Sequence, residues 1–293
     1  MAFLTIGLCV KNCEGFIGET MTSLVEQDFP LERMELIVVD GYSNDKTVRI
    51  IEEGVLKTGM EYRIFYESKG LGTARQIVVD NARGKYIIWL DGDVVLSKSY
   101  VRELIQLMEK NPRVGIAKGR YALDPGANLA ATLEIYSRAA GKMIDFNIKT
   151  SCMGTAGCIY RTEAIRKVGG FDQNIKGYGE DWDAERRIKN AGWLLRTIDA
   201  SYRDYERKGT SWKNIWNKYL RRGYDSYYTF QKHKGLIVLY RWTPPAALLS
   251  GYLHSLTLYR LTRRKAVFLL PLQYSYKMTA WCLGFSKRRL VTH

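Results

Sequence analysis

The first 95 residues alternate between short apolar segments and helical segments, and this alternation constrains the fold more than any other feature of the chain. Strands are predicted over residues 4–10, 34–40, 62–67 and 84–90, and the helical segments between them end near residues 30, 56 and 82. Such alternation at short spacing is typical of a mostly parallel sheet covered by helices. The sequence therefore predicts an α/β fold.

Acidic residues end two of these strands. Asp40 ends the second strand, and Asp91 directly follows the fourth. Ligands of open parallel sheets bind beyond the carboxyl ends of the strands, so two such acids within one nucleotide-sized unit favour a binding site there. Either acid alone is more typical of a turn or a helix cap. Ser43 or Asn44 is expected to cap the helix after the second strand.

The segment Asp91-Gly92-Asp93 places two carboxylates one residue apart. Gly92 allows a sharp turn through which both side chains can converge. Converging carboxylates repel each other unless a cation lies between them, and hard oxygen ligands favour Mg²⁺ or Mn²⁺. A solvated Asp-Gly turn is the alternative interpretation, because this motif alone has low specificity.

Two other kinds of nucleotide-binding motif are absent from the sequence. No Gly-x-Gly-x-x-Gly lies between the first strand and the first helix, where a dinucleotide-binding Rossmann fold requires it. No Gly-Lys-Ser or Gly-Lys-Thr of an NTPase phosphate loop occurs either. These absences disfavour both classes of protein.

Further motifs follow one another in a definite order. The first group is Thr5-Ile-Gly-Leu-Cys-Val-Lys-Asn12, Glu35-Leu-Ile-Val-Val-Asp40-Gly-Tyr-Ser-Asn-Asp45-Lys-Thr47, Gly70 with Ala74-Arg75, Ala82-Arg83-Gly84, and Asp91-Gly92-Asp93. The second group is Ala156-Gly-Cys-Ile-Tyr-Arg161, Val168-Gly-Gly-Phe-Asp172, and Gly179-Glu180-Asp181-Trp-Asp183 followed by Arg186-Arg187. The first group resembles the nucleotide-sugar half of family 2 glycosyltransferases, and the second resembles their acceptor half. Ordered motifs over residues 3–206 are far more specific than any single one.

The resemblance implies a GT-A fold and a division of the chain. Residues 1–206 are expected to form the catalytic domain, with a nucleotide-sugar-binding half over 1–95 and an acceptor half over 96–206. Residues 207–293 are expected to form a helical, membrane-associating segment.

The resemblance also implies which residues bind the donor, a nucleotide-diphospho sugar such as a UDP- or GDP-sugar. Asp40 is expected to contact the base or the ribose, with Val10 and Lys11 beside it. Arg75 is expected near the base or the diphosphate.

The resemblance assigns Asp91 and Asp93 to the ribose and to a Mg²⁺ or Mn²⁺ ion that bridges the two phosphates. Such an ion is needed because negative charge develops on the diphosphate as the glycosidic bond breaks. Without the ion, that charge would face two carboxylates.

Inversion at the sugar also requires a base that takes a proton from the acceptor hydroxyl. By resemblance Asp181 is that base, and Glu180 orients either Asp181 or the acceptor. The alternative is that these acids only complement the dipole at the start of a helix.

The chain departs from the family pattern in two places. The Gln-x-x-Arg-Trp signature of processive synthases is absent, and Arg221-Arg222-Gly223 is the nearest basic element in that region. Polymerisation is therefore disfavoured. Many relatives carry a His after the strand near residues 201–205, whereas Arg203 and Asp204 stand here, so the resemblance leaves the metal shell incomplete.

The charge of the chain is unevenly distributed. Residues 207–293 contain 17 Lys and Arg and one acid, Asp225, so they carry +16, and residues 1–206 carry −1 of the total of +15. A neutral body with a basic terminal segment indicates a local interaction surface and not a nucleic-acid-binding protein. Five cysteines without Cys-x-x-Cys spacing favour a reducing cytosol and disfavour disulfide frameworks and zinc sites.

The basic segment has the composition of a lipid interface. Aromatic and apolar residues recur every three to four positions over 211–232, which predicts an amphipathic helix that packs on the core, lies at a membrane, or does both. Uncharged runs follow over 242–259, 266–276 and 278–286. Basic residues flank every run, namely Arg241, Arg260, Arg263, Arg264, Lys265, Lys287, Arg288 and Arg289. This distribution disfavours a transmembrane hairpin and favours helices that lie in an anionic leaflet at the cytoplasmic face of the cell membrane.

These observations predict an inverting, metal-dependent glycosyltransferase. It is expected to move a hexose-type sugar from a nucleotide-diphospho donor to a polyprenyl phosphate, a lipid-linked saccharide or another membrane-lipid acceptor. Two alternatives stay open, a nucleotidyltransferase acting on a sugar phosphate and a catalytically silent membrane-bound scaffold. Neither the sugar nor the base follows from the residues.

Overall fold

The computed structural model describes residues 3–56, 58–144, 153–204, 208–233 and 243–292. The chain forms two compact units. The sheet unit comprises residues 1–120, 152–176 and 180–204, and the helical unit comprises residues 121–151, 177–179 and 205–293. The predicted boundary between residues 206 and 207 lies outside the described residues, so the division made there stays a prediction.

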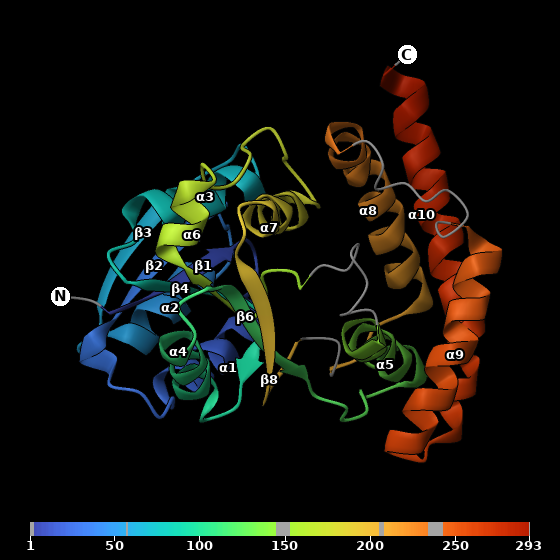
Figure 1. Ribbon diagram of the computed structural model, residues 1–293, viewed down its shortest axis with the longest axis horizontal. Helices are drawn as coiled ribbons and strands as arrows, with labels where there is room; N and C mark the ends of the chain where they lie inside the picture. Colours follow the sequence, from blue (N-terminus) through green and yellow to red (C-terminus); the bar gives the residue numbers. More distant parts are fainter. Residues whose placement is uncertain (1–2, 57, 145–152, 205–207, 234–242, 293) are drawn as a thin grey trace. The chain divides into compact units, whose positions relative to one another are not determined.

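An eight-stranded sheet in the order β3-β2-β1-β4-β7-β6-β8-β5 forms the centre of the sheet unit (Figure 1). Its strands are β1 (Leu4–Val10), β2 (Met34–Asp40), β3 (Glu61–Tyr66), β4 (Tyr86–Asp91), β5 (Val95–Leu96), β6 (Val114–Tyr121), β7 (Cys158–Arg161) and β8 (Leu194–Arg203). The four strands predicted from the sequence, β1 to β4, pair in parallel. β7 then pairs antiparallel with both β4 and β6. The predicted α/β fold with a mostly parallel sheet flanked by helices is confirmed.

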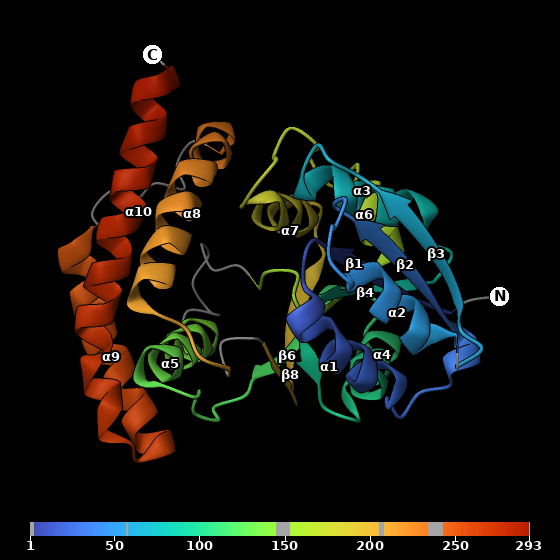
Figure 2. The ribbon, with the colours of Figure 1, turned by 180° about the vertical axis from the view of Figure 1, so that it is seen from behind.

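Helices cover both faces of this sheet. They are α1 (Glu14–Val25), α2 (Thr47–Val55), α3 (Leu71–Asn81), α4 (Tyr100–Lys110), α6 (Thr162–Lys167) and α7 (Glu180–Asn190), with a short 3₁₀ turn η1 (Leu31–Arg33). Figures 1 and 2 show α3 and α6 on one face and α1, α2 and α4 on the other. β1, β2 and β4 are almost wholly buried because helices cover both their faces.

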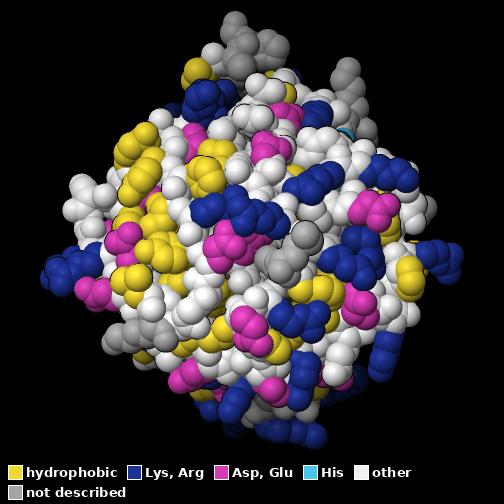
Figure 3. Space-filling model, turned by 90° about the vertical axis from the view of Figure 1, so that its left-hand side faces the viewer, with side chains coloured by type: hydrophobic (Ala, Val, Ile, Leu, Met, Phe, Trp, Pro, Cys, Tyr) yellow, Lys and Arg dark blue, Asp and Glu magenta, His cyan; other side chains and the backbone are white. Residues whose placement is uncertain are grey.

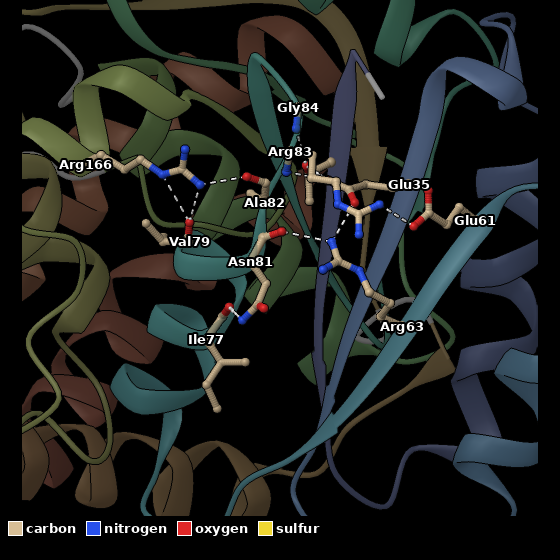
Figure 4. Close-up of polar contacts among 11 residues, drawn as sticks. Glu35, Glu61, Arg63, Ile77, Val79, Asn81, Ala82, Arg83, Gly84 and Arg166 are labelled. Atoms are coloured by element: carbon tan, nitrogen blue, oxygen red, sulfur yellow. Dashed lines mark hydrogen bonds and ion pairs between the residues drawn. The ribbon is translucent and has the colours of Figure 1, made fainter. Parts of the chain in front are cut away.

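At the amino ends of the strands, one buried acid organises a polar network (Figure 4). The Glu35 side chain, 1% exposed, accepts hydrogen bonds from Thr5 Oγ1 at 2.6 Å and from the Arg83 backbone at 2.6 Å. It also pairs with the Arg63 guanidinium at 2.7 Å. Arg63 donates in turn to the carbonyl of Asn81 at 2.9 Å, at the end of α3. The network therefore ties α3 to the strands.

The helical unit consists of α5 (Leu129–Ile144), α8 (Trp212–Lys232), α9 (Pro244–Thr262), η5 (Lys265–Leu269) and α10 (Leu270–Thr292). α10 packs along both α8 and α9, and α5 packs against α9. α8 and α10 approach closely because each presents a glycine: a Cβ on Gly223 would clash with the Trp281 carbonyl, and one on Gly284 would clash with the Leu220 carbonyl.

The helix predicted over 211–232 is confirmed as α8, whose first turn is capped by Ser211 Oγ accepting from the Asn214 backbone at 3.1 Å. The runs at 266–276 and 278–286 belong to one element, since η5 leads into a continuous α10. The residue that starts the earlier run, Trp242, lies outside the described residues. Within the parts of the chain that the structure describes, no helix is both long and apolar enough to cross a bilayer.

The two units differ in charge. The helical unit contains 20 Lys and Arg and 5 Asp and Glu, so it carries the full formal charge of +15, and the sheet unit carries equal numbers of both signs. Figure 3 views the molecule from the side on which β2 and β3 lie, and acidic and basic side chains are interspersed there. The excess positive charge of the chain is thus confined to the helical unit.

Candidate functional site

The carboxyl ends of β1, β2 and β4 bring the predicted donor residues together. Val10 is paired with Asp40, and Cys9 is paired with Asp91, in the register of the parallel strands. The exposed Lys11 follows Val10 directly, and its side chain lies over Gly41, where a Cβ would come within 3.1 Å of it. The parallel sheet therefore assembles this site from segments 30 to 80 residues apart.

The loops after β1 and β2 are held together around Asp40. The Asp40 carboxylate, 1% exposed, accepts from the Ser43 backbone at 2.7 Å and from Ser43 Oγ at 2.6 Å. Ser43 Oγ also accepts from the Asn12 backbone at 2.8 Å. Asn12 and Tyr42 both have left-handed backbone conformations, with φ of 49° and 57°. Such conformations disfavour most side chains and are found where a loop must hold a fixed shape.

The predicted helix cap in this loop is wrong. α2 begins after Lys46, and that position makes no side-chain capping bond. Ser43 is instead committed to Asp40, and Asn44 donates its backbone N–H to Asn12 Oδ1 at 3.0 Å. The reason is local, because the buried carboxylate of Asp40, three residues earlier, accepts both the backbone N–H and the hydroxyl of Ser43.

Asp91 and Asp93 flank Gly92 in a turn that packs closely against Cys13 and Val10. A Cβ on Gly92 would lie 2.7 Å from Cys13 Sγ and 3.1 Å from Val10 Cγ1, so any larger residue would require the Cys13 side chain to move. The Asp91 side chain is 39% exposed, and Asp93 is half-buried. The turn thus presents carboxylate oxygens at the surface.

Arg75 of α3 connects the donor half with the acceptor half of the sheet unit. Its guanidinium, 5% exposed, lies 3.6 Å from the Asp91 carboxylate and forms a close ion pair with Glu180 at the start of α7. The ring of Phe171 lies beneath it, 6.0 Å from the guanidinium carbon. Charge pairs shielded from water are strong and directional, so Arg75 sets the orientation of both acids.

The two acids at the start of α7 have different surroundings. Glu180 is 2% exposed and is paired with Arg75. Asp181 is only half-buried, and its Oδ2 would lie 3.5 Å from a Cβ placed on Gly154. The resemblance had assigned Glu180 to orient Asp181 or the acceptor, and the structure places its carboxylate on Arg75. Asp181 is the more exposed acid of the pair.

Two residues that the sequence had not singled out lie close to these groups. Glu67, after β3, is 8% exposed and accepts from the backbones of Lys69 and Gly70. Lys118 of β6 is 1% exposed and donates to the Met153 carbonyl at 2.7 Å. A lysine within a strand of the sequence Val-Gly-Ile-Ala-Lys-Gly-Arg-Tyr is the only signal that could have marked it.

The pKa of the Cys9 thiol depends on the burial and the charges at this edge. Burial raises the pKa of its thiol to about 12; Arg75 opposes the shift, and Asp91 and Glu67 reinforce it. Cys9 therefore lies among the same charged side chains as the candidate site. It is expected to stay a neutral thiol at physiological pH.

The carboxyl edge suits a divalent cation only in part. Among the described residues, no three His, Cys, Asp or Glu side chains are grouped so that they could hold a metal ion by themselves. Asp91 and Asp93 supply hard carboxylate oxygens of the kind that Mg²⁺ and Mn²⁺ prefer. The residues present therefore fit such an ion if phosphate oxygens of a substrate complete its shell.

Comparison with known proteins decides the family. The model of the family described as glycosyl transferase family 2 matches residues 5–169, more than half of the chain. The chain belongs to glycosyl transferase family 2. Its sequence is 25% identical over 233 residues to the probable glycosyltransferase YdaM of Bacillus subtilis. The aligned region covers 75% of this chain and 54% of YdaM. It is 29% identical over 101 residues to the poly(ribitol-phosphate) beta-N-acetylglucosaminyltransferase TarS of Staphylococcus aureus, covering 34% of this chain and 18% of TarS.

Solved structures of this family share the fold. A mannosyltransferase of Pyrobaculum calidifontis, solved with GDP-mannose and Mn²⁺, superposes with a TM-score of 0.69 at 14% identity, covering 99% of this chain and 88% of that one. S. aureus TarS 1–349 with UDP superposes with a TM-score of 0.55 at 17% identity, covering 99% and 92%. These similarities confirm the GT-A fold of the family 2 chain.

Proposed function

We propose that this family 2 glycosyltransferase moves a hexose-type sugar, with inversion, from a UDP- or GDP-sugar to a membrane-lipid-linked acceptor. The observation that carries the proposal is the position of Arg75, which holds Asp91 of the donor half and Glu180 of the acceptor half in one ion-paired group. Membership of a glycosyltransferase family favours this reaction over the nucleotidyltransferase alternative.

The donor is expected to lie along the carboxyl edge. Asp40, its orientation set by Ser43, is placed to accept hydrogen bonds from the base or the ribose, with Val10 and Lys11 beside it. Asp91 and Asp93 would hold Mg²⁺ or Mn²⁺, and the ion supplies positive charge that stabilises the leaving diphosphate. The GDP-mannose and Mn²⁺ in the related mannosyltransferase support this choice of donor and ion.

The acceptor hydroxyl oxygen would attack the anomeric carbon from the face opposite the diphosphate. Asp181 would take the hydroxyl proton as the new carbon–oxygen bond forms, and the bond to the phosphate oxygen would break with its electron pair leaving on the diphosphate. A half-buried carboxylate can serve as this base because it can reach a substrate. The Glu180 carboxylate is already ion-paired with Arg75, and it would hold Arg75 in place for the donor.

The proposed acceptor and location, at the cytoplasmic face of a membrane, are supported by the apolar outer face of α9. Its inner face, toward the other helices of the helical unit, is mixed: it buries His254 and Ser255 together with Ala247 and Leu258. Its outer face is apolar, with Leu249, Tyr252 and Leu253 each more than half exposed. Apolar side chains turned away from the protein are stabilised by a lipid environment. Four cations follow at the end of α9, namely Arg260, Arg263, Arg264 and Lys265, and these suit anionic headgroups.

The test of the reaction is a panel of UDP- and GDP-sugars incubated with the full chain, Mn²⁺ or Mg²⁺, and vesicles that contain either a lipid-linked saccharide, which supplies an acceptor hydroxyl, or a polyprenyl phosphate. We expect one donor to give metal-dependent release of nucleoside diphosphate together with a glycosylated lipid. Release of pyrophosphate from a nucleoside triphosphate would support the nucleotidyltransferase instead. Failure to bind any nucleotide would point to a catalytically silent scaffold.

The membrane proposal has a separate test. The double variant Leu249→Gln, Leu253→Gln should pellet with anionic vesicles several-fold less than the parent chain, because each side chain contributes on the order of 1.5 kcal/mol or more of apolar transfer energy. A matched control is Leu56→Gln, on the sheet unit, whose side chain is also mostly exposed. Equal pelleting of all three proteins would contradict an interfacial role for α9.

A further inference from the structure

A buried acid in the helical unit is surrounded by an excess of cations. Glu134 of α5 is 0% exposed, and its carboxylate lies 3.0 Å from Lys277 Nζ, 3.6 Å from Lys218 Nζ and 3.7 Å from Arg138 Nε. Burial alone would raise the pKa of the Glu134 carboxyl, but Lys277, Lys218, Arg138 and Arg222 together hold it well below its usual range. One carboxylate therefore stands among four cations, on α5, α8 and α10.

The fourth cation, Arg222, is held differently from the other three. Its guanidinium carbon lies 4.9 Å from the ring centre of Tyr178 and 5.1 Å from that of Tyr219. These ring contacts fix the plane of a side chain that is half-buried. Across the residues that the structure describes, Arg222 has no hydrogen bond to a protein acceptor and no ion pair within 4.0 Å. The N–H groups of an oriented guanidinium are thus left for water or for a ligand.

The same side chains lie close to Glu134. Tyr219, beneath Arg222, donates its hydroxyl to Glu134 Oε1 at 3.3 Å, and its ring also faces Lys277 Nζ at 4.8 Å. Arg222 therefore adjoins Lys218, one turn earlier on α8, and the Glu134 carboxylate that gathers the other cations. Like charges gathered in a partly dry place repel one another, and an added oxyanion relieves that repulsion.

We propose that Arg222, with Lys218 and Arg138 beside it, forms a binding site for a phosphate group in the helical unit. An arginine fork matches two phosphate oxygens, and the lysine supplies a further charge-assisted hydrogen bond. The lipid phosphate of an acceptor and a free phosphate share this chemistry. The lipid assignment rests on the proposed function, whereas binding of the phosphate group itself does not.

Arg221 provides a matched control, because it is the neighbouring residue of α8 and has the same charge. Its side chain is 76% exposed and pairs with Asp225 at 3.7 Å. The experiment compares Arg222→Gln and Arg221→Gln in the full chain, with neutral phosphatidylcholine vesicles that contain either a polyprenyl phosphate or the corresponding polyprenol. In a second arm, inorganic phosphate is titrated into the protein by calorimetry. Binding of UDP and GDP to each variant shows that the sheet unit is folded.

We expect the parent chain and Arg221→Gln to prefer the phosphate-bearing vesicles, and Arg222→Gln to lose about tenfold or more of that preference. Arg222→Lys keeps the stem and the charge but lacks the fork, so it should fold like the parent and still bind several-fold more weakly. If only inorganic phosphate binds in an Arg222-dependent way, the site takes a soluble phosphate and the lipid assignment fails.

Equal losses in Arg221→Gln and Arg222→Gln, or no loss in either, would overturn the phosphate site, because they would indicate general electrostatics or no contribution. This experiment and the test of the proposed function can fail independently of each other. A chain that transfers no sugar yet binds phosphate through Arg222 would retain this inference. A chain that transfers sugar with Arg222→Gln unchanged in phosphate binding would lose this inference alone.

Discussion

Glu35 and Asp91 stand at opposite edges of the parallel sheet, and their surroundings differ. At the amino edge, Glu35 is almost completely buried and its oxygens are occupied by Thr5, Arg63 and the backbone of Arg83 (Figure 4). At the carboxyl edge, the Asp91 side chain is 39% exposed and its ion pair with Arg75 is long, at 3.6 Å. An acid saturated by protein partners stabilises the fold, whereas one that remains accessible can bind a ligand. The comparison predicts which acids affect stability and which affect function.

The largest expected effect is at the carboxyl edge. Asp93→Ala should abolish the Mn²⁺-dependent part of UDP and GDP binding, because a single remaining carboxylate gives the ion too few protein ligands. The stability of the chain should hardly change, since Asp93 lies past the end of β4. Calorimetric titration with and without Mn²⁺, together with a thermal melt, measures both. Metal dependence equal to that of the parent would remove Asp93 as a ligand.

At the amino edge the expected effect is on folding. Glu35→Ala should lower the free energy of unfolding by about 3–5 kcal/mol, because it leaves the Arg63 guanidinium and Thr5 without their buried partner. Nucleotide affinity should stay within about twofold of the parent once the protein is folded. Urea denaturation and nucleotide titration provide the two measurements. A loss of nucleotide affinity without loss of stability would contradict the division between the edges.

Asp181→Asn tests the acceptor side of the carboxyl edge. Sugar transfer should fall by roughly 10²-fold or more, the usual scale for removing a general base, while donor binding survives. Donor hydrolysis and transfer rates at saturating nucleotide sugar provide the readout. Near-normal turnover would move the base elsewhere, and Glu180→Gln would then be compared. The Glu180→Gln variant is expected to bind the donor more weakly, because Glu180 holds Arg75.

The pKa of a thiol at the carboxyl edge depends on its burial and on the negative charges near it. Burial raises the pKa of Cys13 to about 11; a hydrogen bond from Thr47 opposes the shift, and Asp45, Asp93 and Asp40 reinforce it. Because the pKa is raised, the thiolate fraction at pH 8 is about a hundredfold below that of a free cysteine, and alkylation should be slower by a similar factor. Its rate should rise with pH throughout the range 7–10. Peptide mapping after iodoacetamide treatment measures the alkylation rate of Cys13, with urea-unfolded protein as the control. Equal rates in the folded and unfolded protein would contradict the raised pKa.

The smallest effect is expected for an exposed pair at the amino edge. Glu61 and Arg83 form an ion pair at 2.5 Å, but their side chains are 55% and 53% exposed. Glu61→Ala should therefore change the free energy of unfolding by at most about 1 kcal/mol. It is the control for Glu35→Ala, because both acids stand at the same edge and differ in burial. Similar losses in the two variants would show that burial does not separate them.

Much of the sheet unit follows from the sequence because its information is local. Apolar runs bounded by turn residues specify β1 to β4, and the parallel connections then place Asp40 and Asp91 at one edge. The motifs Asp91-Gly92-Asp93 and Glu180-Asp181 and the family were also recognisable in the residues alone. The motif Ala82-Arg83-Gly84 was recognisable too, at the start of the predicted fourth strand. It lies at the amino edge, where Gly84 donates to Thr5 Oγ1 at 3.0 Å.

Partners distant in the chain were decided only by the tertiary structure. Arg75 meets Glu180, more than 100 residues later in the chain, because α3 and α7 converge over the sheet. Glu134 gathers cations from α8 and α10, more than 80 residues away. A residue's identity states which bonds its side chain can form, but burial and competition among neighbours select the ones that form. For this reason the sequence predicted the acids of the site, and only the fold showed which of them are already occupied.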